Sequence, residues 1–274
     1  ASPNDSNSPV SGLAVGENIF EWTVLNGPCA NPLTADRVSI FVFDDQQPVA
    51  DAGPDQELCS PTFTTTLAGS DIIFPATGTW SVTQGAGVFA NANNPHSVVS
   101  GLAVGVNIFT WTIDNGPCVN GITTNQVSIL VFDENNADAD AGSDQEHCTP
   151  TNSVTLGGSP VIVPAVGTWT VVSGTANITD PNNPNTQITG LGVGEVVLQW
   201  SVDNRPCANG VTLDRVSIFI FDQKTTDANA GADQDLCTPN TITTLDGSPV
   251  TFPAIGTWVL VNGQGVITNA NAPN

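Results

Sequence analysis

Cysteine is the residue type with the most regular spacing in this 274-residue chain. Paired cysteines in small repeated domains favour a disulfide framework and an oxidising, extracellular setting. Zinc is a weaker interpretation, because each period supplies only two cysteines and His96 and His147 do not recur. The cysteines form two sets with steps of 89 residues: Cys29, Cys118 and Cys207, and Cys59, Cys148 and Cys237.

Two disulfide pairings are compatible with this spacing, and pairing within each repeat is our first expectation. It would join Cys59 with Cys118, Cys148 with Cys207, and Cys29 and Cys237 with partners outside the segment. The alternative joins Cys59 to Cys207, because tandem stacking would bring the first turn of one domain near a late loop of the next. Both pairings stay open at this point.

Acidic residues gather where one repeat gives way to the next. Calcium prefers six to eight oxygen ligands, several of them carboxylates, so a calcium ion at each boundary would neutralise charge and stiffen the array. The alternative is a solvated acidic hinge kept soluble by repulsion. Neither interpretation requires a cofactor for folding. The candidate calcium ligands are Asp51 and Asp55 at the first boundary, and Asp133, Asp138, Asp140 and Asp144 at the second.

The overall charge limits the partners that this chain can have. It carries 26 acidic and four basic residues, which gives a net charge of −22. This charge repels nucleic acid phosphates and anionic lipid surfaces, so neither is an expected partner. No apolar run approaches the roughly 18–20 residues of a membrane span. Because 39% of the residues are hydrophobic and alternate with polar ones, the chain is not a disordered acidic tail.

The residues needed for catalysis do not recur. A catalytic site needs a nucleophile, a base and an orienting group, or a metal ion, but the two histidines are isolated in the sequence. Glycine-rich pieces such as "GGSPV" lack the strand and helix context of a phosphate-binding loop. Lys224 is the sole lysine, so a recurring Lys–Asn isopeptide bond is impossible. We therefore expect no enzyme activity in this segment.

The elements that position these residues are domain-sized repeats. The string "GLAVGENIFEWTVLNGPC" begins at Gly12, and near-copies begin at Gly101 and Gly190, each 89 residues further on. A period of this length is larger than a solenoid repeat and indicates a string of small domains. The predicted division is 1–49, the C-terminal half of a repeat; 50–138 and 139–227, two complete repeats; and 228–274, the N-terminal half of a repeat.

Each repeat shows the alternation of β-strands. In "VNIFTWTID", Phe109, Trp111 and Ile113 share one face, which is typical of a half-buried antiparallel strand. About seven strands with turn signals every 8–12 residues predict an all-β fold of tandem antiparallel immunoglobulin-like β-sandwiches. Phe132, at the end of the repeat, either fills the junction to the next domain or is covered by its own loops. The residues predicted to fill the cores are Trp80, Trp111, Trp169 and Trp200.

Two short motifs carry a resemblance to a known family. "ADAGPDQ" at the start of the domain, and an alternating strand followed by "DNGPC", resemble the immunoglobulin-like and PKD-like repeats of large secreted surface proteins of the Bacteroidota. The resemblance covers the chain repeat by repeat, but the cysteine pair departs from the usual PKD-like pattern. It implies an extracellular array of β-sandwiches used for adhesion, spacing or filament building.

The sequence therefore favours a structural function. We expect a segment of an extracellular adhesin or filament that acts as stalk, spacer or fibre, with neighbouring repeats or copies of itself as partners. Two alternatives are an array of ligand- or glycan-binding modules, with a site near loop 115–124, and a spacer attached to a secreted enzyme. Because Ala1 and Asn274 both align with mid-repeat positions, we expect either a window on a longer array or a subunit whose halves are completed by neighbours.

Overall fold

The computed structural model describes residues 4–224 and 227–270, and in these ranges it contains strands and turns but no helix. No apolar helix of membrane-spanning length therefore occurs in the described ranges. The chain separates into two compact units that meet in the sequence between Glu134 and Asn135, and each is described by itself. The all-β prediction is confirmed.

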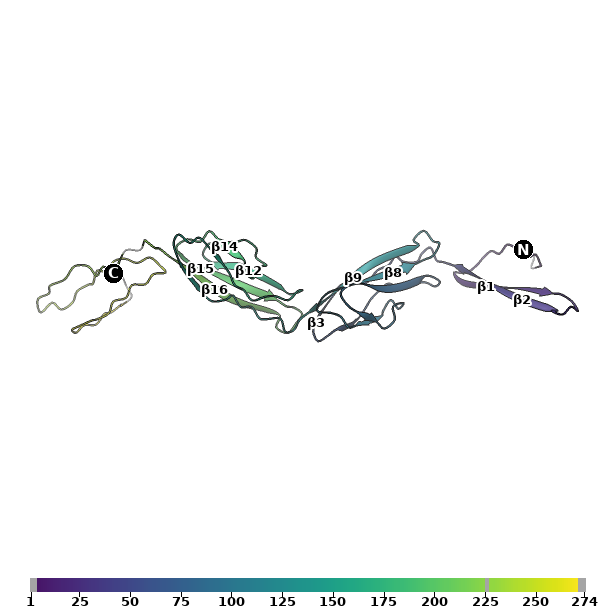
Figure 1. Ribbon diagram of the computed structural model, residues 1–274, viewed down its shortest axis with the longest axis horizontal. Helices are drawn as coiled ribbons and strands as arrows, with labels where there is room; N and C mark the ends of the chain where they lie inside the picture. The colour runs from purple at the N-terminus through teal and green to yellow at the C-terminus, as the bar shows by residue number, and fades with distance from the viewer. Residues whose placement is uncertain (1–3, 225–226, 271–274) are drawn as a thin grey trace. The chain divides into compact units, whose positions relative to one another are not determined.

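The first full repeat (residues 50–138 of the predicted division) contains seven strands (Figure 1). They are β3 (Gln56–Cys59), β4 (Thr64–Thr66), β5 (Thr77–Gln84), β6 (Val88–Phe89), β7 (Val98–Ser100), β8 (Gly105–Asp114) and β9 (Ile122–Phe132). One sheet has the order β3-β9-β8-β5, and the other has the order β4-β7-β6. This is the predicted two-sheet sandwich.

The second full repeat (residues 139–227) has the same topology in the second unit. Its strands are β10 (Gln145–Cys148), β11 (Ser153–Thr155), β12 (Val166–Ser173), β13 (Asn177–Ile178), β14 (Gln187–Thr189), β15 (Gly194–Asp203) and β16 (Val211–Phe221). They form sheets of order β10-β16-β15-β12 and β11-β14-β13. Repeats that share a sequence pattern thus share their strand order.

One strand pair in each full repeat departs from the antiparallel prediction. β3 runs parallel to β9, with Gln56 opposite Ile129 and Cys59 opposite Phe132, and β10 pairs with β16 in the same way. These are the first and last strands of their repeats. Parallel neighbours need a long crossover connection, and the intervening strands of the repeat provide it. The other strand pairs described in the two repeats are antiparallel, as predicted.

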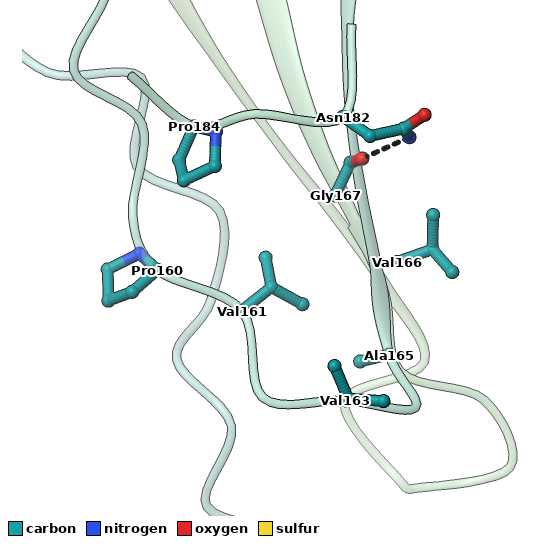
Figure 2. A pocket seen from close by; sticks show the side chains of 8 residues that line it. All are labelled: Pro160, Val161, Val163, Ala165, Val166, Gly167, Asn182 and Pro184. Atoms are coloured by element: carbon teal, nitrogen blue, oxygen red, sulfur yellow. Dashed lines mark hydrogen bonds between the residues drawn. The ribbon is translucent and has the colours of Figure 1, made fainter. Parts of the chain in front are cut away.

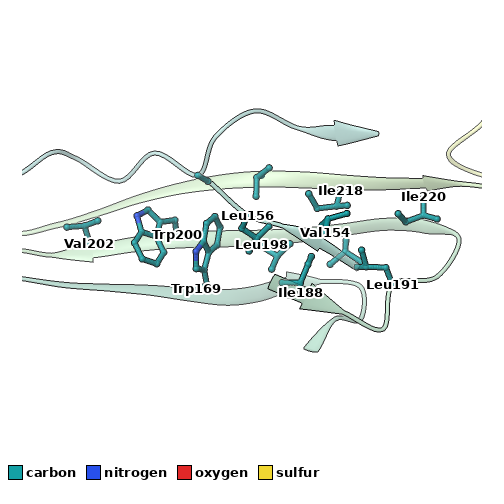
Figure 3. Packing of buried hydrophobic residues seen from close by; sticks show 13 residues of the cluster. Val154, Leu156, Trp169, Ile188, Leu191, Leu198, Trp200, Val202, Ile218 and Ile220 are labelled. Carbon is teal, nitrogen blue, oxygen red and sulfur yellow. The ribbon is translucent and has the colours of Figure 1, made fainter. Parts of the chain in front are cut away.

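Alternation along the central strands builds the core. On β8 the side chains of Phe109, Trp111 and Ile113 are 0–1% exposed, while the residues between them face outward and are only partly buried. Successive side chains of a strand point to opposite faces, so one face supplies the core and the other meets solvent. Figure 3 shows the equivalent cluster of the second full repeat, with Trp169 and Trp200 between the sheets.

A tryptophan pair occupies the centre of each sandwich. Trp80 lies opposite Trp111 on the neighbouring strand, with ring centroids 4.9 Å apart, and the Trp169–Trp200 pair repeats this arrangement at 5.0 Å. The Trp111 ring fills the space above Gly78, where a Cβ atom would lie 2.4 Å from it. Real Cβ atoms do not approach so closely, so glycine is required here.

The two half-repeats do not form closed sandwiches. In the N-terminal half, β1 (Gly16–Leu25) pairs with β2 (Leu33–Val42) as a two-stranded hairpin, in the register of β8 and β9. Trp22 of this hairpin is 45% exposed. Residues 227–270 contain no assigned strand. A half-repeat carries only part of the two layers, and an isolated two-stranded hairpin is at best marginally stable in water.

The burial of the tryptophans gives a test by matched substitutions. Trp111→Ala should destabilise the first full repeat by about 3–5 kcal/mol, because it opens a large cavity in a packed core. Trp22→Ala, the same change in an exposed hairpin, should cost about 1 kcal/mol or less. Guanidinium unfolding followed by far-UV circular dichroism measures both. Equal losses in the two variants would contradict the assignment of Trp111 to a closed core.

Candidate functional site

The cysteines are divided between disulfide and free thiol. Cys59 and Cys207 each take part in a disulfide bond. Cys59 ends the first strand of its repeat, and Cys207 is buried in the turn after β15. The remaining four described cysteines have free thiols: Cys29, Cys118, Cys148 and Cys237.

Pairing within each repeat, our first expectation, is therefore wrong in this structure. It required Cys118 to bond to Cys59 and Cys148 to bond to Cys207, but both Cys118 and Cys148 are free. The topology gives the reason. Cys59 lies at the end of β9 where the chain leaves the repeat, beside Phe132, whereas Cys118 lies in the loop before β9 begins. The length of β9 separates the two positions.

Three of the aspartates at the repeat boundaries accept hydrogen bonds from backbone N–H groups. Asp55 Oδ1 accepts a hydrogen bond from Ser128 N at 2.7 Å, and Asp144 Oδ1 accepts the equivalent bond from Ser217 N at 2.8 Å. Asp51 Oδ1 accepts from Gly53 N at 2.9 Å within a turn. Asp55 and Asp144 thus fasten the first segment of their repeats to the last strand, and sequence reasoning missed this role. The signal was present, since the aspartate and serine recur together at the 89-residue step.

The remaining candidate calcium ligands are dispersed. Asp140 Oδ1 accepts from Gly142 N at 2.8 Å, Ser60 Oγ lies 3.5 Å from Asp133 Oδ1, and the backbone oxygen of Asp138 accepts from Ser159 Oγ. In the described part of the chain, no three acidic, histidine or cysteine side chains come together in a metal-binding arrangement. Calcium binding at the boundaries stays a prediction.

The linker after β2 is docked on the first full repeat. Phe43 lies against Gly116, where a Cβ atom would be 2.7 Å from the ring, and Asn115 Nδ2 donates to Asp44 O at 2.9 Å. Gln47 is 3% exposed, and its Oε1 accepts from Ile73 N at 2.6 Å. The aromatic residue at the end of this half-repeat therefore fills the junction, which is one of the two alternatives considered for its equivalent Phe132.

The same docking recurs in the second unit. Asn136, the equivalent of Gln47, is 4% exposed, and its Oδ1 accepts a hydrogen bond from Ile162 N at 2.9 Å. Its backbone oxygen accepts from Asn209 Nδ2 at 3.2 Å. Linker residues expected to form a solvated acidic hinge are thus held by the repeat that follows them. A recurring amide side chain in an otherwise acidic linker was the signal that sequence reasoning overlooked.

The loop after β15 carries a local charge pair. Arg205 occupies the position of Gly27 and Gly116, and its Nη2 donates to Asp203 Oδ2 at 2.5 Å. This hydrogen bond, with the nearby positive charge, lowers the pKa of Asp203 below its usual value. A lowered carboxyl pKa contributes stability that is present above the unfolded-state pKa and is lost as the pH falls through the folded-state pKa. The Arg205 side chain is 70% exposed and that of Asp203 is 38% exposed, so solvent screens the pair and the contribution is small.

A shallow apolar pocket opens on the second full repeat (Figure 2). Its volume is about 310 Å³, and Val161, Val163 and Val166 line much of it. Its one amide side chain, Asn182, donates to Gly167 O at 2.7 Å and so serves the fold. The lining offers neither a charged group nor a nucleophile, and the pocket gives no specific support for catalysis.

No protein-family model matches the chain. Among curated proteins, the mouse dyslexia-associated protein KIAA0319 homolog is 31% identical over 157 residues, which span 55% of this chain and 14% of the mouse protein. The human protein KIAA0319 is 28% identical over 160 residues, with the same coverage. The chain thus spans about a seventh of the length of these curated relatives.

The solved structures that resemble the chain include PKD and immunoglobulin domains. The PKD domain of the KIAA 1837 protein is 34% identical and covers 33% of this chain and 92% of its own, with a TM-score of 0.28. Titin domains I67–I69 are 14% identical and cover 74% of each chain, with a TM-score of 0.32. The strand order described above, rather than these scores, establishes the chain as tandem immunoglobulin-like β-sandwiches.

The cysteine assignment can be checked by thiol mapping. When the chain is alkylated without reduction and cleaved at aspartate, Cys29, Cys118, Cys148 and Cys237 should be labelled, because their thiols are free. Peptides that contain Cys59 and Cys207 should become labelled only after reduction. The pairing of Cys59 with Cys207 stays a prediction, and the same peptide map tests it. A linked peptide of Cys59 and Cys118 would contradict the assignment.

Calcium binding can be tested by thermal melting. A bound ion stabilises the folded state by about 2.7 kcal/mol at a free concentration of 100 times the dissociation constant, so EDTA should then lower the melting temperature. Asp138→Asn combined with Asp140→Asn should remove this difference, whereas Asp180→Asn, away from the boundary, should keep it. Melting curves that coincide with and without EDTA would exclude the boundary ion.

Proposed function

We infer that this chain is a segment of an extracellular structural protein in which tandem sandwiches act as stalk, spacer or fibre. The proposal assigns no catalysis to the segment. The observation that carries it is the parallel pairing of the first and last strands of each full repeat.

Parallel first and last strands place the two chain ends of a repeat at opposite ends of the sandwich. Ala50 N, at the start of the first full repeat, donates to Thr123 Oγ1 near the beginning of β9. The chain leaves after Phe132, whose backbone oxygen accepts from Ser60 N at 2.9 Å. These positions are about 30 Å apart along β9, at roughly 3.3 Å per residue. The sandwich therefore spans the distance between the two chain ends of its repeat.

The same geometry resists tension by shear. A force that pulls the two chain ends apart draws β3 and β9 past each other along their common axis. All hydrogen bonds between the strands then carry the force together, whereas a peeled hairpin would break them one at a time. The Asp55–Ser128 bond and the Ala52 N to Asn125 Oδ1 bond, at 3.1 Å, reinforce this pair. Each full repeat thus has a mechanical fastening between its first and last strands.

Two further features support an extracellular setting. The disulfide bonds of Cys59 and Cys207 fit an oxidising compartment. The net charge of −22 keeps closely spaced copies soluble through mutual repulsion. A role as an adhesin or filament of bacterial surfaces follows only from the motif resemblance and stays a prediction, since the curated relatives named above are mammalian.

Single-molecule force spectroscopy tests the proposal. Under reducing conditions, each full repeat should unfold in one step that releases about 30 nm, from 89 residues at roughly 3.6 Å per residue less the folded length. Asp55→Ala with Asp144→Ala should lower the unfolding force of both repeats, because each change removes a hydrogen bond worth on the order of 1 kcal/mol between the sheared segments.

The control lies on the same strands. Glu57→Ala with Glu146→Ala removes exposed carboxylates from β3 and β10 and should leave the unfolding force unchanged. If the aspartate variant unfolded at the same force as the control, or if the repeats yielded gradually without a force peak, the mechanical role would be refuted.

A further inference from the structure

The linker that precedes each full repeat places one amide side chain in a buried site. Gln47 is 3% exposed, although its neighbours Gln46 and Pro48 are exposed. Asn136, which lies 89 residues further on, is 4% exposed. Polar side chains are normally buried only where they make hydrogen bonds, so each amide marks a specific contact. We refer to the contact of Gln47 or Asn136 with the repeat that follows it as the amide clasp.

The two amide clasps share one hydrogen bond. Ile73 N donates to Gln47 Oε1 at 2.6 Å, and Ile162 N donates to Asn136 Oδ1 at 2.9 Å. The two isoleucines lie in equivalent loops, between β4 and β5 and between β11 and β12. Gln47 Nε2 also donates to Asp71 O at 3.3 Å. A backbone amide of the repeat is therefore held by a side chain of the linker in both cases.

The second clasp uses only one end of its amide side chain. Asn136 is shorter than glutamine by one methylene group, and none of the residues that the structure describes accepts a hydrogen bond from its Nδ2. A buried donor without a partner costs free energy, which is recovered when water solvates the group. This cost favours an open state of the linker. Opening the clasp also moves a polar group, and not a hydrophobic one, into water.

Tension reaches the clasp before it reaches the paired strands. Gln47 precedes Ala50 and Ala52, whose N–H groups donate to side chains of the last strand, β9. The second full repeat has the same order of contacts. A pull on the linker from its N-terminal side therefore loads the clasp first. The clasp has few hydrogen bonds, whereas the β3–β9 pair resists shear with all its bonds together.

We propose that the amide clasp opens and closes while its repeat stays folded, and that this gives the chain a reversible extension at low force. The segment 44–49 reaches about 20 Å when fully extended, at roughly 3.3–3.6 Å per residue. The gain from one clasp is smaller, because the docked linker already spans part of this length. The inference rests on the proposed stalk function, in which a joint that yields first spares the sandwich from transient loads.

Hydrogen exchange of the 274-residue chain, followed residue by residue by NMR, tests whether the clasp opens separately. Exchange at Ile73 N and Ile162 N should depend little on low concentrations of denaturant, because local opening exposes little surface. The ladder amides of β8 and β9 should exchange more slowly and accelerate with denaturant, because they require unfolding. Gln47→Ala should speed exchange at Ile73 at least tenfold and leave Ile162 and the ladder amides unchanged.

Gln46→Ala is the matched control, because Gln46 is exposed and its Nε2 donates to Asp45 Oδ1 within the linker itself. This variant should leave exchange at Ile73 unchanged. Two results would overturn the proposal. One is exchange at Ile73 and Ile162 that is as slow and as sensitive to denaturant as that of the ladder amides. The other is a Gln47→Ala chain whose ladder amides accelerate as much as Ile73 does.

Constant-force spectroscopy extends the test to tension. Below the unfolding force of the full repeats, the unmodified chain should switch reversibly between a shorter and a longer length. Gln47→Ala with Asn136→Ala should stay at the longer length, yet its repeats should unfold at the same force, because the β3–β9 and β10–β16 pairs are intact. An unmodified chain that never switches would contradict the clasp and leave the shear resistance of the repeats, and hence the proposed stalk, standing.

Discussion

The packing of a tryptophan on a glycine across neighbouring strands is the contact on which the fold depends. Trp111 and Trp200 are fully buried, and each requires that the facing strand carry no side chain at Gly78 or Gly167. This contact brings the late strands of a repeat against its early strands. Removing either partner of the contact would open a cavity in the core of the repeat.

Much of the fold could be predicted from the sequence because its determinants are local. The alternation of Phe109, Trp111 and Ile113 fixes which face of β8 is buried, and the 89-residue step fixes the size of the unit. Turn residues between short alternating runs indicate the seven strands. These signals depend on neighbours in the sequence, so they do not require knowledge of which strands meet in space.

The features that sequence reasoning missed depend on contacts between distant segments. The parallel pairing of β3 with β9 joins residues 73 positions apart, and no periodicity records it. Disulfide partners follow from the same topology, so the free thiol of Cys118 could not be inferred from spacing. The acidic residues at the boundaries suggested an ion, and that prediction is untested, but the hydrogen bonds of Asp55 and Asp144 to distant backbone amides were not foreseen. The sequence alone does not distinguish an aspartate that accepts hydrogen bonds from a strand from one that binds a cation.

The common register of the three long hairpins has a consequence for folding. The β1–β2, β8–β9 and β15–β16 hairpins present similar surfaces, so each could complete the early strands of any repeat. Surface fit alone cannot select the correct partner. The cost of closing a loop grows with its length, so early strands are captured most readily by the hairpin that follows within about fifty residues. Order of synthesis and proximity along the chain, more than the shape of the surfaces, keep the early strands of one repeat from pairing with the hairpin of another.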